Sequence, residues 1–310
     1  MRLAKFWGRD SAEVDDVSVT ARGWSNESLE AAKAKAREIA RHVTDRVLNH
    51  PGVKEKYPYG DRPLPEQVLK TFRGGAAVVT RNLYGAEILN TDEMMFVDID
   101  RDDPRPSRVN VEAVAARHGL SGRWYRTFAG YRVILTDRKF MPGSPESEAL
   151  FQEFGADQMY VRLCKMQISF RARLTPKPWR CDWYKPRGKY PYETPYDEET
   201  MREWVGQYDR KAAEYSTCEL VSSFGGQVLP EFGDLIAYHD QVSKAASGLP
   251  LFSRSRSVDA PPLANPGGRI SHAAGPRVHR CARQSSPVAP ATNRAATAPS
   301  DTRRSTTMRS

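Results

Sequence analysis

Two aspartates at the end of a predicted strand could bind a metal ion. The apolar run 94–97 leads directly into Asp98-Ile99-Asp100, and side chains two positions apart on a strand lie on the same face of a sheet. Two carboxylates so close repel each other unless a cation lies between them, and oxygen-seeking Mg²⁺ or Mn²⁺ fills that role. The pair therefore predicts a metal site. The alternative is a solvated acidic turn that continues through Asp102 and Asp103.

A short arginine-containing hairpin is a candidate for binding phosphate. The segment 126–132 reads RTFAGYR, and its Ala129-Gly130 turn predicts two paired strands that bring Arg126 and Arg132 close together. Guanidinium forks fit phosphate oxygens, and a glycine turn lets backbone approach a ligand. An ordinary hairpin with exposed arginines is the alternative, and without further partners it is the favoured interpretation.

A basic stretch with interleaved aromatic residues follows between residues 162 and 189. It holds nine basic residues against one acid, Asp182. Cations mixed with stacking side chains are typical of proteins that bind single-stranded nucleic acid. A charged edge strand with a surface loop is the alternative. We predict that nucleic acid or phosphate is bound by Arg171, Arg173, Lys177, Trp179 and Arg180.

The elements that carry these residues follow one another in a clear order. The pattern predicts a strand over 94–100, a helix capped by Asn110, strands over 123–128 and 131–136, a helix over 144–155 and a strand over 159–164. This βαββαβ order is that of the ferredoxin-like and RRM-like antiparallel sheet, in which four strands lie against two helices. We therefore predict an α+β fold built on this core.

The rest of the chain divides into three regions. A helix capped by Ser25 or Asn26 dominates residues 1–75, which we expect to form an N-terminal helical segment. The α+β core is predicted over 76–250. It adds a hairpin from 76–80 and 85–89, a strand over 167–174 and two helices, one starting at Asp197 and one over 231–244.

The charge of the chain is concentrated in its C-terminal tail, residues 251–310. The net charge is +9, but the tail contains ten Arg and two acidic residues, whereas residues 1–250 contain 37 basic and 36 acidic residues. The tail is also rich in Pro, Ser and Ala and holds one aromatic residue, so we predict that it is disordered. It is either an electrostatic arm or dispensable, and the absence of lysine favours the second interpretation.

Several classes of protein are disfavoured by the sequence. No apolar run approaches the roughly 18 to 20 residues that span a bilayer, and residues 1–7 lack the features of a signal peptide. We expect a cytoplasmic protein with no membrane partner. The four cysteines form no C-x-x-C pair, so we expect free thiols rather than a zinc site or a disulfide framework.

Residues 94–175 resemble the catalytic core of the archaeo-eukaryotic primase superfamily, the primase-polymerases. The resemblance rests on the apolar strand that ends in Asp98-Ile99-Asp100, on the glycine turn at Gly130 that leads into an apolar strand, and on the later basic strand. It implies metal-dependent nucleotidyl or phosphoryl transfer, with a nucleotide and a nucleic acid as partners.

The resemblance also implies roles for single residues. Asp98 and Asp100 would hold Mg²⁺ or Mn²⁺, and Arg132 stands where the family has a phosphate-contacting histidine. A third acidic residue of the family corresponds to Asp157, with Asp137 as the second choice. Two other classes of function stay open: a non-catalytic module that binds single-stranded nucleic acid on an RRM-like fold, and a purely structural protein.

Overall fold

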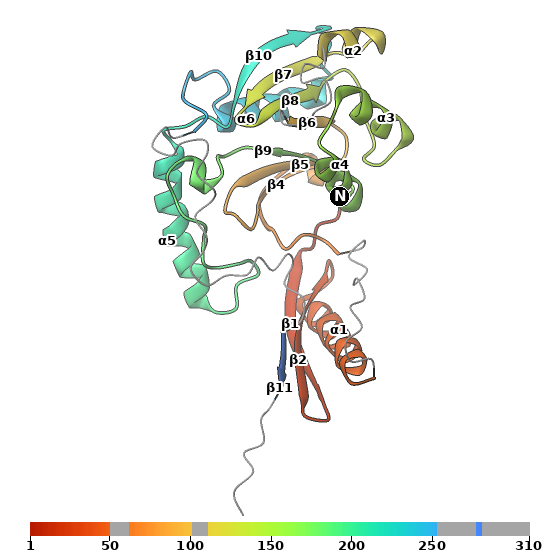
Figure 1. The fold of residues 1–310 in the computed structure, drawn as a ribbon, viewed down its shortest axis with the longest axis vertical. Helices are drawn as coiled ribbons and strands as arrows, with labels where there is room; N and C mark the ends of the chain where they lie inside the picture. The colour runs from red at the N-terminus through yellow and green to blue at the C-terminus, as the bar shows by residue number, and fades with distance from the viewer. Residues whose placement is uncertain (50–61, 101–110, 253–276, 281–310) are drawn as a thin grey trace, which may run out of the picture.

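The computed structural model describes residues 1–49, 62–100, 111–252 and 277–280. These residues form three antiparallel sheets with helices packed against them, stacked one above the other in Figure 1. The mixed α+β class predicted from the sequence is confirmed. No helix in these segments is long and apolar enough to cross a membrane.

The upper sheet in Figure 1 carries the two aspartates. Its strand order is β10-β7-β8-β6 and every neighbouring pair is antiparallel. Helices α2, α3 and α6 contribute side chains to the core on which it rests. The bounds are β6 Phe96–Asp100, β7 Gly122–Thr127, β8 Gly130–Leu135, β10 Cys218–Phe224, α2 Val111–Arg117, α3 Pro145–Phe154 and α6 Gly233–Ser243.

The middle sheet has the order β3-β4-β5-β9 and is also antiparallel. One hydrophobic core joins it to the upper sheet, because Leu89 and Phe170 belong to the same buried cluster as Phe96 and Ile134. Two helices lie beside it in Figure 1. The bounds are β3 Gln67–Phe72, β4 Ala77–Arg81, β5 Glu87–Thr91, β9 Phe170–Arg173, α4 Gln158–Gln167 and α5 Pro195–Ala212.

The N-terminal unit, lowest in Figure 1, has a small core of its own. Strands β1 (Phe6–Val14) and β2 (Val17–Ser25) form a hairpin, and helix α1 (Leu29–Asn49) packs on it through small residues. A Cβ atom at Gly23 would lie 2.2 Å from the carbonyl oxygen of Ala32, so this strand lets the helix backbone approach closely.

Two segments, one near each end of the chain, differ from the prediction. Residues 6–25, which we assigned to an N-terminal helical segment, form the β1–β2 hairpin, and Ser28 rather than Ser25 or Asn26 caps α1 through its hydroxyl. Residues Arg277–Arg280, inside the predicted disordered tail, form strand β11, which pairs antiparallel with β2. The remaining tail residues after 252 lie outside the described residues.

The predicted strand over 159–164 is wrong, because this segment lies within helix α4. Asp157 caps the helix by accepting a hydrogen bond from the Tyr160 N–H, and Cys164 and Gln167 are buried at helical spacing. The alternation of residues in this segment resembled a strand, but the capping aspartate and the buried face select a helix. The βαββαβ order therefore ends at its fifth element, and the next strand, β9, joins the middle sheet.

The other predicted elements are confirmed. The structure contains the hairpins β4–β5 and β7–β8, the strands β6 and β9, and the helices α1, α2, α3, α5 and α6. The helix cap predicted at Asn110 lies outside the described residues. Three cysteines, Cys164, Cys181 and Cys218, are free and buried, as expected for core thiols. Cys281 lies outside the described residues.

We predict that Gly23→Ala destabilises the protein by about 1 to 3 kcal/mol, because the added methyl group would overlap the backbone of α1. Gly206→Ala is the matched control. It lies in α5 with no atom within 4 Å of the added Cβ, so it should stabilise by roughly 0.5 to 1 kcal/mol. Equilibrium urea unfolding measures both. Equal stability of Gly23→Ala and the wild type would contradict this packing.

Candidate functional site

Asp98 and Asp100 lie at the end of β6, on one face of the upper sheet. Across the ladder, Asp98 pairs with Arg132 and Asp100 pairs with Gly130 of β8. A Cβ atom at Gly130 would lie only 1.8 Å from the Ile99 carbonyl oxygen. The glycine therefore permits close contact between β8 and the strand that carries the aspartates.

Arg132 connects the upper sheet to the middle sheet. Its side chain is 4% exposed, and one Nη lies 3.8 Å from the Asp98 carboxylate. The other Nη donates a hydrogen bond of 2.8 Å to the backbone carbonyl of Arg173 in β9. Arg132 therefore lies beside Asp98 as predicted, but its guanidinium is buried and already bonded to protein.

A buried histidine, His239, contacts the Arg132 guanidinium. His239 of α6 places Nε2 3.3 Å from an Arg132 Nη and Nδ1 2.9 Å from the Asp240 carboxylate. Because arginine only donates, Nε2 accepts and the ring proton lies on Nδ1, where it is donated to Asp240. Asp240 also accepts hydrogen bonds from Tyr125 and Arg123. Although burial acts to raise it, hydrogen bonds from His239 and Tyr125 hold the pKa of Asp240 below its ordinary value.

Three further cations approach the aspartates from the end of β9 and the following 3₁₀ turn η3 (Pro178–Arg180). Burial, with repulsion from Arg173 and Arg180, lowers the pKa of Lys177 to about 8, and burial with repulsion from Arg173 lowers that of Arg180 to about 10. Burial also lowers the pKa of Arg173. Asp98 and Asp100 oppose these shifts, so all three cations lie within their electric field. We call Arg173, Lys177 and Arg180 the cation cluster.

The cation cluster has no acidic partner at bonding distance. None of its three side chains makes a hydrogen bond or ion pair with a residue that the structure describes, and the buried Nε of Arg173 has no hydrogen-bond acceptor there. An arginine keeps its proton at ordinary pH. The lowered pKa values therefore reflect the unfavourable burial of like charges, which a bound anion would relieve.

Arg171 is separate from the cation cluster although it is only two residues from Arg173. Its guanidinium is bonded to both oxygens of Glu66, at 2.8 and 2.9 Å, and to Asn90 Oδ1 at 2.7 Å. The side chains of Arg171 and Glu66 are 9% and 5% exposed. Arg171 thus holds β9 to β5 and to the segment before β3, and it does not present a free guanidinium for phosphate.

Arg126 also lies away from the aspartates. The ladder pairs Arg126 with Tyr131 and Tyr125 with Arg132, so the two arginines project from opposite faces of the hairpin. Arg126 is exposed and forms an ion pair with Glu219 of β10. The expected proximity of the Arg126 and Arg132 side chains is therefore wrong. The ladder places Arg126 opposite Tyr131 rather than opposite Arg132.

The two candidates for a third acidic residue differ in position. The Asp157 backbone N–H donates to the Asp98 carbonyl at 2.9 Å, so this residue is beside the site, while its Oδ1 caps α4. Asp137 binds the Ser121 N–H and Arg138, beyond the opposite end of β8. Only Asp157 is positioned near the aspartate pair.

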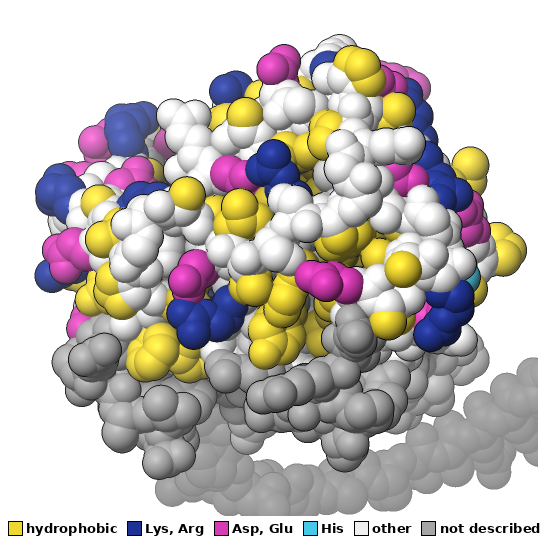
Figure 2. Space-filling view, turned by 90° about the horizontal axis from the view of Figure 1, so that it is seen from above, with side chains coloured by type: hydrophobic (Ala, Val, Ile, Leu, Met, Phe, Trp, Pro, Cys, Tyr) yellow, Lys and Arg dark blue, Asp and Glu magenta, His cyan; other side chains and the backbone are white. Residues whose placement is uncertain are grey.

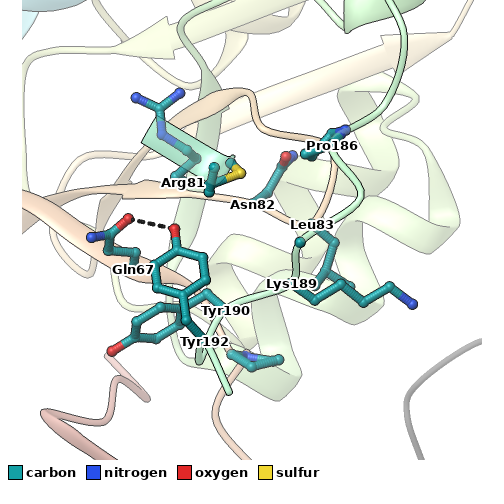
Figure 3. Close-up of a pocket in the computed structure, with 11 residues that line it drawn as sticks. Gln67, Arg81, Asn82, Leu83, Pro186, Lys189, Tyr190 and Tyr192 are labelled. Atoms are coloured by element: carbon teal, nitrogen blue, oxygen red, sulfur yellow. Dashed lines mark hydrogen bonds between the residues drawn. The ribbon is translucent and has the colours of Figure 1, made fainter. Parts of the chain in front are cut away.

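Two surface hollows among the described residues lie away from the aspartates. The pocket in Figure 3, between the β4–β5 turn and the loop before α5, contains a Tyr192–Gln67 hydrogen bond of 3.1 Å. Its cavity of about 10 Å³ holds no more than one water molecule. A hollow of about 330 Å³ between α2 and the end of β10 contains none of the charged site residues. Figure 2, which looks down on the upper sheet, shows acidic and basic side chains interspersed, with no patch of one sign.

The chain matches no protein-family model, no curated protein and no solved structure.

The sequence did not predict the residues that contact the arginines of this region, His239, Asp240 and Glu66. His239 and Asp240 lie on a predicted helix, and the only signal was a polar residue on its apolar stripe, which continues from Leu235 and Ile236. Glu66 gave no signal, because its partner Arg171 is 105 residues away.

We predict that Arg171→Ala lowers the free energy of unfolding by about 3 kcal/mol or more, because it leaves the buried Glu66 carboxylate unpaired. Arg126→Ala, which removes an exposed ion pair, should change it by less than about 1 kcal/mol. Chemical unfolding of both variants measures the difference. Similar small effects would show that Arg171 is not a structural residue.

Proposed function

We propose that this protein binds a divalent metal ion at Asp98 and Asp100 and the phosphates of a nucleotide at the adjacent cation cluster. With these ligands it catalyses metal-dependent nucleotidyl or phosphoryl transfer on nucleic acid. The observation that supports the proposal is the cation cluster. Three half-buried cations without acidic partners among the described residues lie in the field of two carboxylates.

The charge arrangement favours a phosphate ligand over a carboxylate or a neutral one. Burying like charges together is costly, and a polyanion with several oxygens offsets that cost at all three side chains at once. Guanidinium groups bind phosphate with paired N–H donors, and an ammonium group acts as a point charge. Arg173, Lys177 and Arg180 supply both kinds of group.

The donor chemistry of the aspartate pair fits Mg²⁺ or Mn²⁺. The described residues contain no group of three His, Cys, Asp or Glu side chains able to hold a metal. Magnesium sites that handle nucleotides commonly use only one or two protein carboxylates, with water and substrate phosphates as the other ligands. The metal, when bound, would neutralise phosphate charge and orient the transferred group.

Each side chain then has a defined task. Asp98 and Asp100 hold the metal, and the cation cluster binds phosphate oxygens and stabilises negative charge that develops on the leaving group. Arg132 acts as a positioning residue, because its guanidinium is bonded to the Arg173 carbonyl and lies beside Asp98. This differs from direct contact with phosphate, the role the family resemblance implies at this position.

We expect Asp98→Asn and Asp100→Asn each to abolish Mn²⁺ binding in the presence of a non-hydrolysable nucleoside triphosphate, measured by calorimetry. Glu13→Gln, an exposed carboxylate on β1, is the control and should bind normally. Incorporation of labelled nucleotide into an oligonucleotide should be lost with the metal. Wild-type binding in both aspartate variants would reject the site, and binding without transfer would identify a non-catalytic module.

The pH dependence of nucleotide binding provides a second test. Because the pKa of Lys177 is lowered to about 8 in the free protein, a bound phosphate should raise it and binding should take up a proton. Without metal, triphosphate affinity should fall above pH 8 by up to about tenfold per pH unit.

Lys177→Arg keeps its proton over this range, so in this variant the fall should be absent. Calorimetry in buffers of different ionisation enthalpy also reports the proton uptake directly. The same pH profile in wild type and variant would exclude Lys177 from the phosphate site.

A further inference from the structure

Two aromatic side chains lie beside the cation cluster, although they come from distant parts of the chain. Tyr84 lies in the turn between β4 and β5, and Trp179 lies in η3. Their ring centroids are 5.2 Å apart with the rings perpendicular. Tyr84 is 42% exposed, so a large ring surface faces solvent next to the proposed phosphate site.

The turn that carries Tyr84 is held firmly. Asn82 Oδ1 accepts hydrogen bonds from the backbone N–H groups of Tyr84 and Ala86, at 2.9 and 3.1 Å. Gly85 has a φ of +85°, and a Cβ there would overlap the Trp204 ring that packs beneath it. The exposed ring is therefore pre-positioned rather than carried by a loose loop, which lowers the entropy cost of binding.

Lysines surround the two rings. The Lys185 Nζ lies 5.1 Å from the centroid of Trp179 and 5.3 Å from that of Tyr84, and the Lys177 Nζ lies 5.5 Å from Trp179. In these cation–π contacts the ammonium groups lie over the faces of the rings and hold positive charge against the aromatic surface. We call Tyr84, Trp179 and Lys185 the stacking platform.

The stacking platform is continuous with the aspartate site. Arg180, next to Trp179, lies over the ring of Phe128 at 4.2 Å from its centroid. Phe128 belongs to the β7–β8 turn, whose Gly130 pairs with Asp100. A chain of rings and cations thus leads from the aspartates to the β4–β5 turn.

We propose that the stacking platform binds the unpaired bases of a single-stranded nucleic acid, with Lys185 contacting the backbone phosphates. The inference names the nucleic-acid partner of the proposed site, and to that extent it rests on the proposed function. Stacking itself needs no metal ion, so the two can be tested separately.

The chemistry of the platform selects single strands. Rings stack on any base, whereas bases in a duplex are stacked on each other and are not accessible. The platform rings carry a hydroxyl and an indole N–H, too few groups to read base edges, so binding should tolerate most sequences. An acidic peptide could satisfy the lysines, but it would gain little from Tyr84 and Trp179.

The test is fluorescence anisotropy of a labelled single-stranded oligonucleotide with the full-length protein in EDTA. Tyr84→Ala and Trp179→Ala should each weaken binding about tenfold, because one stacked base is lost. Tyr196→Ala, which removes a tyrosine that is 77% exposed on α5, is the matched control. All variants retain the arginine-rich tail, so its contribution cancels in the comparison.

Conservative variants distinguish the loss of a stacking ring from a loss of folding. Tyr84→Phe and Trp179→Phe retain a stacking ring and should bind within about threefold of wild type. Unchanged affinity in both alanine variants, or equal competition by duplex or polyglutamate, would overturn the platform. Because the assay contains EDTA, it does not depend on the metal site, so a failed metal site and a failed platform give different results.

Discussion

The Arg132 side chain is the interaction on which the site depends. It crosses from β8 in the upper sheet to the carbonyl of Arg173 in the middle sheet, while its other nitrogen lies beside Asp98. His239 accepts a hydrogen bond from the same guanidinium and is itself oriented by Asp240. Because the aspartates belong to one sheet and the cation cluster follows a strand of the other, this contact fixes the distance between the two charge sets.

The imbalance between these charge sets is the reason for proposing a ligand at this site. Two interior arginines elsewhere, Arg171 and Arg81, have the carboxylate partners Glu66 and Glu87. The cation cluster lacks them, and a protein that only had to fold would gain from neutralising it. Metal at the aspartates and phosphate at the cations would complete the balance, with the stacking platform continuing the same surface toward unpaired bases.

Local patterns predicted the elements and residues that are close in sequence better than the contacts between distant segments. The aspartate pair and the basic stretch were visible in the sequence, because strand spacing and composition are local properties. The sequence did not show which arginine side chains lack a carboxylate partner. Arg171 and Arg173 lie on the same strand, and only Arg171 is paired with the distant Glu66. The segment 159–164 shows the same limit, since its alternation fits a strand until Asp157 is known to cap a helix.

Metal and nucleotide binding are tested most directly by a crystal structure of the protein with Mn²⁺ and a non-hydrolysable nucleoside triphosphate, using the anomalous signal of manganese. We expect a manganese peak between the carboxylates of Asp98 and Asp100, with the triphosphate oxygens in contact with Arg173, Lys177 and Arg180. Manganese and triphosphate bound elsewhere, with the cation cluster unoccupied, would contradict the account.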